Sequence, residues 1–99
     1  MKTLALFLLI SGTAAAQSAE VKGTVTLHVK DEDVVDILKS MKKQCGVRNM
    51  VIDKDVAGKG TIYFKDVPCG TAFRVVFRQF GLAGQPDPTL MFVETRKSR

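Results

Sequence analysis

The stretch Thr61-Ile62-Tyr63-Phe64-Lys65-Asp66-Val67-Pro68 decides the fold. Ile62 and Phe64 alternate with polar side chains, which is the pattern of a strand with one buried face. Pro68 then suits the first turn of a helix, where the backbone N–H that proline lacks would have no partner. The stretch therefore predicts a strand that leads directly into a helix.

The same unit stands 35 positions earlier in the chain. Thr26-Leu27-His28-Val29-Lys30-Asp31 aligns without gaps with the residues from Thr61 to Asp66. The alignment continues until Gln44-Cys45-Gly46-Val47 meets Gln79-Phe80-Gly81-Leu82. Identical residues fall at Thr26/Thr61, Lys30/Lys65, Asp31/Asp66, Gln44/Gln79 and Gly46/Gly81. This indicates an internal strand–helix repeat, with chance similarity between two amphipathic segments as the alternative.

Each copy carries the signals of a helix after its strand. In the first copy, Asp31, Asp33 and Asp36 suit the N-terminal end of a helix, and Gly46 suits its left-handed stop. The second helix is predicted to start at Pro68 and to stop at Gly81. The apolar face of the first helix comprises Val34, Ile37, Leu38, Met41 and Cys45. That of the second comprises Cys69, Ala72, Phe73, Val76, Phe77 and Phe80.

A further apolar stretch follows each helix. Residues 50–52 follow the first, and residues 90–93 follow the second after a loop at 83–88. The expected order is β-α-β-β-α-β. This is an α+β fold with an internal βα repeat, in which two helices pack against small sheets.

Length and composition restrict the classes of function. The 99 residues suffice for one small domain, and the net charge is +5. With one His and two Cys, a zinc site of the usual ligand spacing is nearly excluded. We therefore expect neither a metal nor a cofactor.

The sequence contains no strong pattern of catalytic residues, and we expect that the protein is not an enzyme. His28 is expected on the exposed face of its strand, and the sequence signals no nucleophile to pair with it. Asp31, Asp33 and Asp36 fit helix capping better than a calcium loop, which needs more oxygen ligands and a glycine turn. Gly58-Lys59-Gly60-Thr61 lacks the first glycine of a phosphate loop and leads into a strand, so we interpret it as a turn.

The N-terminal residues 1–16 have the pattern of a secretory signal peptide. Lys2 precedes an apolar run at 4–10, and small residues follow, with Ala14 and Ala16 before the cut. The alternative is a membrane anchor or a buried helix, but seven apolar residues span only about 10 Å as a helix. We expect export, a domain at 17–95 and a solvated basic tail at 96–99, with no membrane span in the mature chain.

The ordered set of motifs resembles the short N-terminal domain shared by secretins and TonB-dependent receptors. It comprises the strand at 25–31, the helix end Gln44-Cys45-Gly46-Val47, the segment 53–59, the strand ending Lys65-Asp66-Val67-Pro68 and the helix end Phe80-Gly81-Leu82. The resemblance covers residues 24–82. It implies two helices between small sheets and a non-catalytic binding module of the periplasm, possessed by proteins of the outer membrane that act in secretion, pilus assembly or signalling.

The implied partner is a protein of the cell envelope, an inner-membrane platform or a regulator. Members of the family continue into further domains and an outer-membrane barrel, whereas this sequence stops at Arg99. We therefore expect a free-standing copy of the module or a truncated frame. The alternative is a small secreted hydrolase or inhibitor that shares only the fold. A pocket of converging polar side chains would favour the hydrolase or inhibitor. An exposed strand edge would favour the interaction module.

Nucleic acid is not expected as a partner. The excess of basic over acidic residues is a feature of many nucleic-acid-binding proteins. If the two repeat strands are neighbours, one surface would also carry His28, Lys30, Tyr63 and Lys65. One aromatic side chain is too few for a stacking platform, however, and export removes most nucleic acids from reach.

The two cysteines are predicted to form a disulfide. Cys45 ends the first helix and Cys69 opens the second, both on apolar faces. A pseudo-two-fold axis between the copies makes the helices antiparallel and brings these ends together, and an antiparallel hairpin between 50–52 and 62–64 does the same. The alternative is two buried free thiols.

The strand at 90–95 is our expected site of partner binding. No further chain follows to cover it, and a small domain of this kind has at least one open strand edge. Both faces of the strand are apolar, so one face is a candidate for exposure. The expected partner-binding residues are Leu90, Met91, Phe92 and Val93.

Overall fold

The computed structural model describes residues 21–96. The expected signal peptide at 1–16 and residues 97–99 of the expected tail lie outside this range. All buried residues of the core fall between Val21 and Val93, so the described part of the chain holds a hydrophobic core of its own.

Two helices and five strands follow one another along these residues. They are β1 (Thr24–Asp33), α1 (Val34–Cys45), β2 (Asn49–Ile52), β3 (Lys59–Pro68), α2 (Cys69–Gln79), β4 (Leu82–Gly84) and β5 (Leu90–Thr95). The α+β class is confirmed, with one strand more than expected. The additional strand β4 begins at Leu82 and includes part of the expected loop at 83–88. It is three residues long and has too few positions for an alternating pattern to be recognised.

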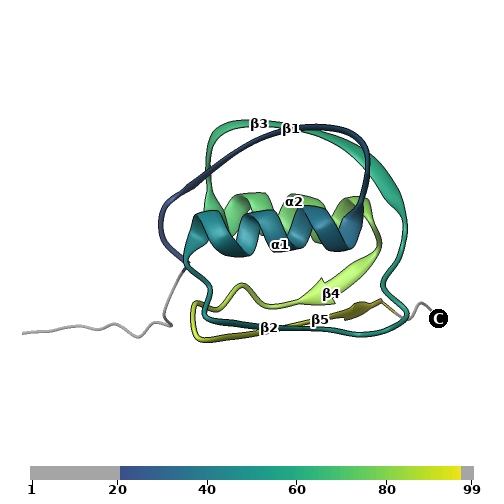
Figure 1. The fold of residues 1–99 in the computed structure, drawn as a ribbon. Coiled ribbons are helices and arrows are strands. Elements are labelled where there is room, and N and C mark those ends of the chain that lie inside the picture. Colours follow the sequence, from purple (N-terminus) through teal and green to yellow (C-terminus); the bar gives the residue numbers. More distant parts are fainter. Residues whose placement is uncertain (1–20, 97–99) are drawn as a thin grey trace, which may run out of the picture.

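The elements form three layers (Figure 1). The helices lie side by side in the middle, the antiparallel ribbon β1–β3 lies on one side, and the sheet of order β2-β5-β4 lies on the other. β2 pairs parallel with β5, and β4 pairs antiparallel with β5. The considered hairpin between 50–52 and 62–64 is therefore wrong, because these two strands belong to different sheets.

The internal repeat is confirmed by hydrogen bonds that occur twice. The Val34 amide donates to the Gly58 carbonyl at 2.9 Å, and the Cys69 amide donates to the Gly23 carbonyl at 2.9 Å. Val34 and Cys69 differ by the repeat offset of 35 positions, and so do Gly23 and Gly58. Each copy thus fixes the start of the other copy's helix, as an approximate two-fold axis requires.

A second pair of equivalent bonds holds the two repeat strands together. The amide of Asp66 donates to Thr26 Oγ1 at 3.1 Å, and the amide of Asp31 donates to Thr61 Oγ1 at 3.3 Å. Both aspartates adopt positive φ angles, 50° at Asp31 and 53° at Asp66. Aspartate tolerates this left-handed backbone better than most residues, which explains its place at the bend in each copy.

The helices contribute most of the core and end as predicted. Asp33 accepts a hydrogen bond from the Val35 amide at 2.9 Å and so caps α1, and Gly46 ends α1 with a φ of 66°. Gly81 adopts a φ of 65° after α2. The buried residues of the two helices are Val34, Ile37, Leu38, Met41 and Cys45 in α1, and Cys69, Ala72, Phe73, Val76 and Phe77 in α2. The expected apolar faces are confirmed, with Phe80 partly buried at their margin.

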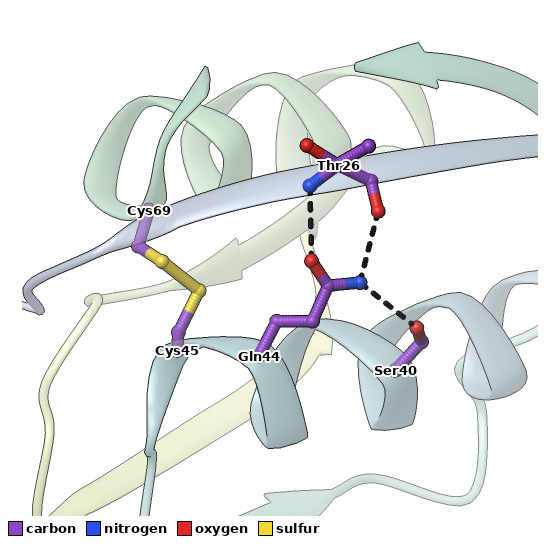
Figure 2. Close-up of a disulfide and its surroundings, with 5 residues drawn as sticks. All are labelled: Thr26, Ser40, Gln44, Cys45 and Cys69. Carbon is purple, nitrogen blue, oxygen red and sulfur yellow. Dashed lines mark hydrogen bonds between the residues drawn. A yellow bond between two sulfur atoms is a disulfide. The ribbon is translucent and has the colours of Figure 1, made fainter. Parts of the chain in front are cut away.

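The predicted disulfide between Cys45 and Cys69 is present in the structure. Figure 2 shows it joining the last turn of α1 to the first turn of α2. These ends meet because the approximate two-fold axis makes the helices antiparallel. The pseudo-symmetric route to the disulfide is therefore the one that the fold uses.

One side chain of α1 binds the backbone of β1 next to this disulfide (Figure 2). Gln44 accepts a hydrogen bond from the Thr26 amide at 2.9 Å and donates one to the Thr26 carbonyl at 3.0 Å. Its amide nitrogen also lies 3.5 Å from Ser40 Oγ. The side-chain amide of Gln44 thus bonds both backbone groups of Thr26, as a neighbouring strand would.

We expect Gln44→Ala to lower the free energy of unfolding by about 1 kcal/mol, because two exposed hydrogen bonds are exchanged for bonds to water. The melting temperature should fall by roughly 4 to 8 °C in a domain of this size, which thermal denaturation followed by circular dichroism measures. Lys39→Ala, on the exposed side of the same helix, is the control and should change little. Equal melting temperatures for Gln44→Ala and the unaltered chain would contradict this role.

Candidate functional site

The strand β5 is the central strand of its sheet, not an edge. It pairs with β2 on one side and with β4 on the other, so its backbone hydrogen-bonding groups are used within the fold. The prediction of an open edge at 90–95 is therefore wrong. The expectation failed because β4 was not recognised and because the pairing of β2 with β5 joins segments about 40 residues apart.

The side chains of β5 divide between the core and the solvent. Met91 and Val93 are buried under the helices, whereas Leu90 and Phe92 are exposed. Of the four residues expected to bind a partner, only Leu90 and Phe92 can therefore be reached without unfolding the sheet. Contact of these two residues with a partner remains a prediction.

An apolar patch covers the solvent side of this sheet. Phe92 is 59% exposed, Leu90 46% and Val51 45%. Val51 lies opposite Phe92 in the parallel register, and Asn49 lies opposite Leu90. Val51, Leu90 and Phe92 thus form a connected exposed surface, called the apolar face below.

The two outer strands of the sheet each adjoin a groove beside a helix. The first groove lies between α1 and β2 and is lined by Lys39, Lys42, Lys43, Gly46, Val47, Arg48, Met50 and Ile52. The second lies between α2 and β4 and is lined by Thr71, Arg74, Val75, Phe77, Arg78, Leu82, Ala83, Gly84 and Arg96. Both linings contain basic and apolar side chains and no acidic one. We call the first the lysine groove and the second the arginine groove.

The opposite side of the molecule carries an aromatic pair on the ribbon β1–β3. The rings of His28 and Tyr63 meet edge to face with their centroids 5.3 Å apart, and the two residues are partners in the strand register. Tyr63 is 69% exposed. Lys30 and Lys65 are exposed on the same two strands. The expected neighbourhood of these four residues is confirmed.

Residues examined as catalytic or metal-binding candidates have structural roles or lie at the surface. Asp33 caps α1, and Asp31 forms a bend in the strand. The segment after Gly58 enters strand β3 and not a helix, as expected. Within residues 21–96 there is no group of three His, Cys, Asp or Glu side chains placed to hold a metal ion. Neither helix in this part of the chain has the length and hydropathy to cross a membrane.

The sequence is similar to one curated protein, DNA utilization protein HofQ of Escherichia coli (strain K12). The two are 30% identical over 90 residues, which cover 91% of this chain and 21% of HofQ. The chain thus spans about a fifth of the length of this relative. HofQ is a secretin, and the match supports a secretin-related domain of N-terminal type. No family model matches the chain.

Sequence reasoning missed the lysine groove as a candidate site. Lys39, Lys42 and Lys43 lie toward the C-terminal end of α1, where cations are favourable next to the helix dipole without any binding role. Their spacing of three and four residues places them on one side of the helix, which is a signal visible in the sequence. What the sequence did not show is the open edge of β2 next to them.

Proposed function

We propose that this chain is a non-catalytic protein-interaction module of the periplasm, of the type found at the N-terminus of secretins and TonB-dependent receptors. The observation that carries this proposal is the similarity to the secretin HofQ over 91% of the chain. The partner is a protein of the cell envelope, such as an inner-membrane platform or a regulator.

The surface of the domain supports this proposal. The apolar face presents three large side chains to solvent, and the sheet has β2 and β4 as its outer strands. The disulfide is compatible with export, since such bonds persist outside the reducing cytoplasm. Each groove combines positively charged and apolar side chains. A hydrolase needs an acidic and a basic group next to each other, so this arrangement suits binding better than hydrolysis.

Photo-crosslinking in cells of the source organism tests the proposal. We expect the photoreactive residue p-benzoylphenylalanine, placed at Phe92 or at Lys43, to form adducts with an envelope protein. Tyr63, exposed on the opposite sheet, is the matched control position and should give fewer adducts. Absence of protein adducts from all three positions would contradict a protein-interaction role.

Contact with DNA is the second candidate function, because HofQ is named a DNA utilization protein. The specific feature that favours it is the ribbon surface, where Tyr63 meets His28 edge to face and Lys30 and Lys65 are exposed on the same strands. Fluorescence anisotropy with labelled single-stranded and duplex DNA distinguishes the two candidates. Binding that Tyr63→Ala abolishes would favour DNA over a protein partner.

A further inference from the structure

We propose that the outer edge of β2, together with the lysine groove, takes up an extended acidic segment of the partner protein as an additional strand. This inference rests on the proposed function as a protein-interaction module and specifies the chemistry of the partner. The site comprises the edge of β2, the apolar floor of Val47, Met50 and Ile52, and the basic rim of Lys39, Lys42, Lys43 and Arg48.

The edge of β2 offers unpaired backbone groups to a partner strand. Within residues 21–96, β2 pairs with β5 and with no other strand. At the end of β2, the Asp53 amide donates to the Val93 carbonyl of β5 at 2.8 Å. Because successive residues of a strand direct their amides to opposite sides, Val51 directs its amide to β5, whereas Met50 and Ile52 direct theirs away from it. A strand laid along β2 would meet these groups directly.

The lysine groove fits alternate side chains of such a strand. Its volume is about 560 Å³, and its floor is apolar. Side chains of an added strand would alternate between the groove and the solvent, since the side-chain period of a strand is two. Lys39, Lys43 and Arg48 of the rim are exposed, Lys42 is partly buried, and the lining contains no acidic side chain. Carboxylates on the added strand would therefore be attracted along the whole groove.

The same features disfavour other occupants. A second copy of this chain would bring four more positive charges to the edge, which opposes pairing of β2 with β2. Nucleic acid would leave the apolar floor and the amides of β2 without suitable partners, and the groove lining has no aromatic side chain on which a base could stack. An acidic segment with apolar residues satisfies the edge, the floor and the rim together.

The arginine groove serves as a built-in comparison. It also combines cations with apolar side chains, but its strand β4 has three residues and β2 has four. The approximate symmetry of the domain makes Arg74 and Arg78 on α2 a counterpart to the lysines on α1. A variant that loses as many arginines here as another loses lysines in the lysine groove has the same net charge. Comparing the two variants therefore separates a local effect on binding from a general electrostatic one.

Binding of a labelled peptide tests the proposal on the chain from residue 17 to 99, which contains the whole described core. The probe is a fluorescein-labelled nine-residue peptide of alternating Glu and Val, with a Lys/Val peptide as the charge control. A third Glu/Val peptide carries N-methyl groups on every internal amide and cannot pair as a strand through either edge. We expect saturable binding of the first peptide alone, with the largest NMR shifts at the amides of Met50 and Ile52.

Two variants locate the site. The triple variant Lys39→Gln, Lys42→Gln, Lys43→Gln should weaken binding about tenfold, as three charge contacts of ordinary strength at the surface allow. Met50→Pro removes an outward amide without breaking the β2–β5 ladder and should abolish binding. The matched triple variant Arg74→Gln, Arg78→Gln, Arg96→Gln in the arginine groove should leave the affinity within twofold. Unchanged melting temperatures would show that the variants remain folded.

Several results would overturn the inference. These are equal binding of the N-methylated peptide, an equal loss in the arginine variant, or displacement of the peptide by duplex DNA at lower concentration. Absence of peptide binding, combined with envelope-protein adducts from Phe92, would reject the β2 site and leave the interaction module standing. Absence of adducts from every photoreactive position would instead reject the proposed function itself.

Discussion

Replacement of both Cys45 and Cys69 by alanine is expected to lower the free energy of unfolding by about 3.5 kcal/mol. The disulfide closes a loop with a sequence separation of 24 residues, and the chain-entropy model gives this magnitude for such a loop. Since small domains are stable by only about 5 to 15 kcal/mol, the bond supplies a large share of the total. The melting temperature should fall by roughly 15 to 25 °C.

Thermal denaturation with and without dithiothreitol provides the measurement. The reductant should lower the melting temperature of the unaltered chain and leave that of the double variant unchanged. A double variant as stable as the oxidised chain would show that the disulfide contributes nothing to stability. The packing of α1 against α2 would then hold these helix ends together by itself.

Met91→Lys is expected to prevent folding. Met91 is fully buried on the central strand β5, and within residues 21–96 no buried side chain is polar or charged. An ammonium group placed there would lose its hydration without gaining a partner, at a cost of several kcal/mol. Circular dichroism and the dispersion of amide NMR signals should show an unfolded chain.

The matched control is Phe92→Lys at the next position of the same strand. Phe92 points to solvent, so this change should alter the free energy of unfolding by no more than about 0.5 kcal/mol. It should instead reduce the adducts of p-benzoylphenylalanine placed at Val51, which lies opposite residue 92 on the apolar face. Unfolding by Phe92→Lys together with tolerance of Met91→Lys would mean that the strand faces the other way.

Several features of the fold could be predicted from local sequence, because local chemistry fixes them. Gly46 and Gly81 end the helices in the left-handed conformation that glycine adopts most easily. Asp33 caps α1 through its own side chain. The repeat was visible because the two copies keep the same residues where they make the same contacts, such as Thr26 and Thr61.

The candidate site could be predicted only in part. Exposure of Leu90 and Phe92 follows from alternation along a strand, but the sequence did not show which of the two apolar sides of β5 faces the helices. That choice depends on where the helices lie. The lysines of α1 were visible, while the strand edge beside them was not.

The sequence by itself determined the two strand–helix units, the ends of the helices and the approximate symmetry that brings Cys45 to Cys69. These depend on neighbouring residues or on one repeated pattern. Only the tertiary structure decided that β5 lies between β2 and β4 and that β2 is left with an open edge. Strand pairing joins backbone groups that every residue carries, so its partners are chosen by the packing of the whole chain and leave little trace in any single segment.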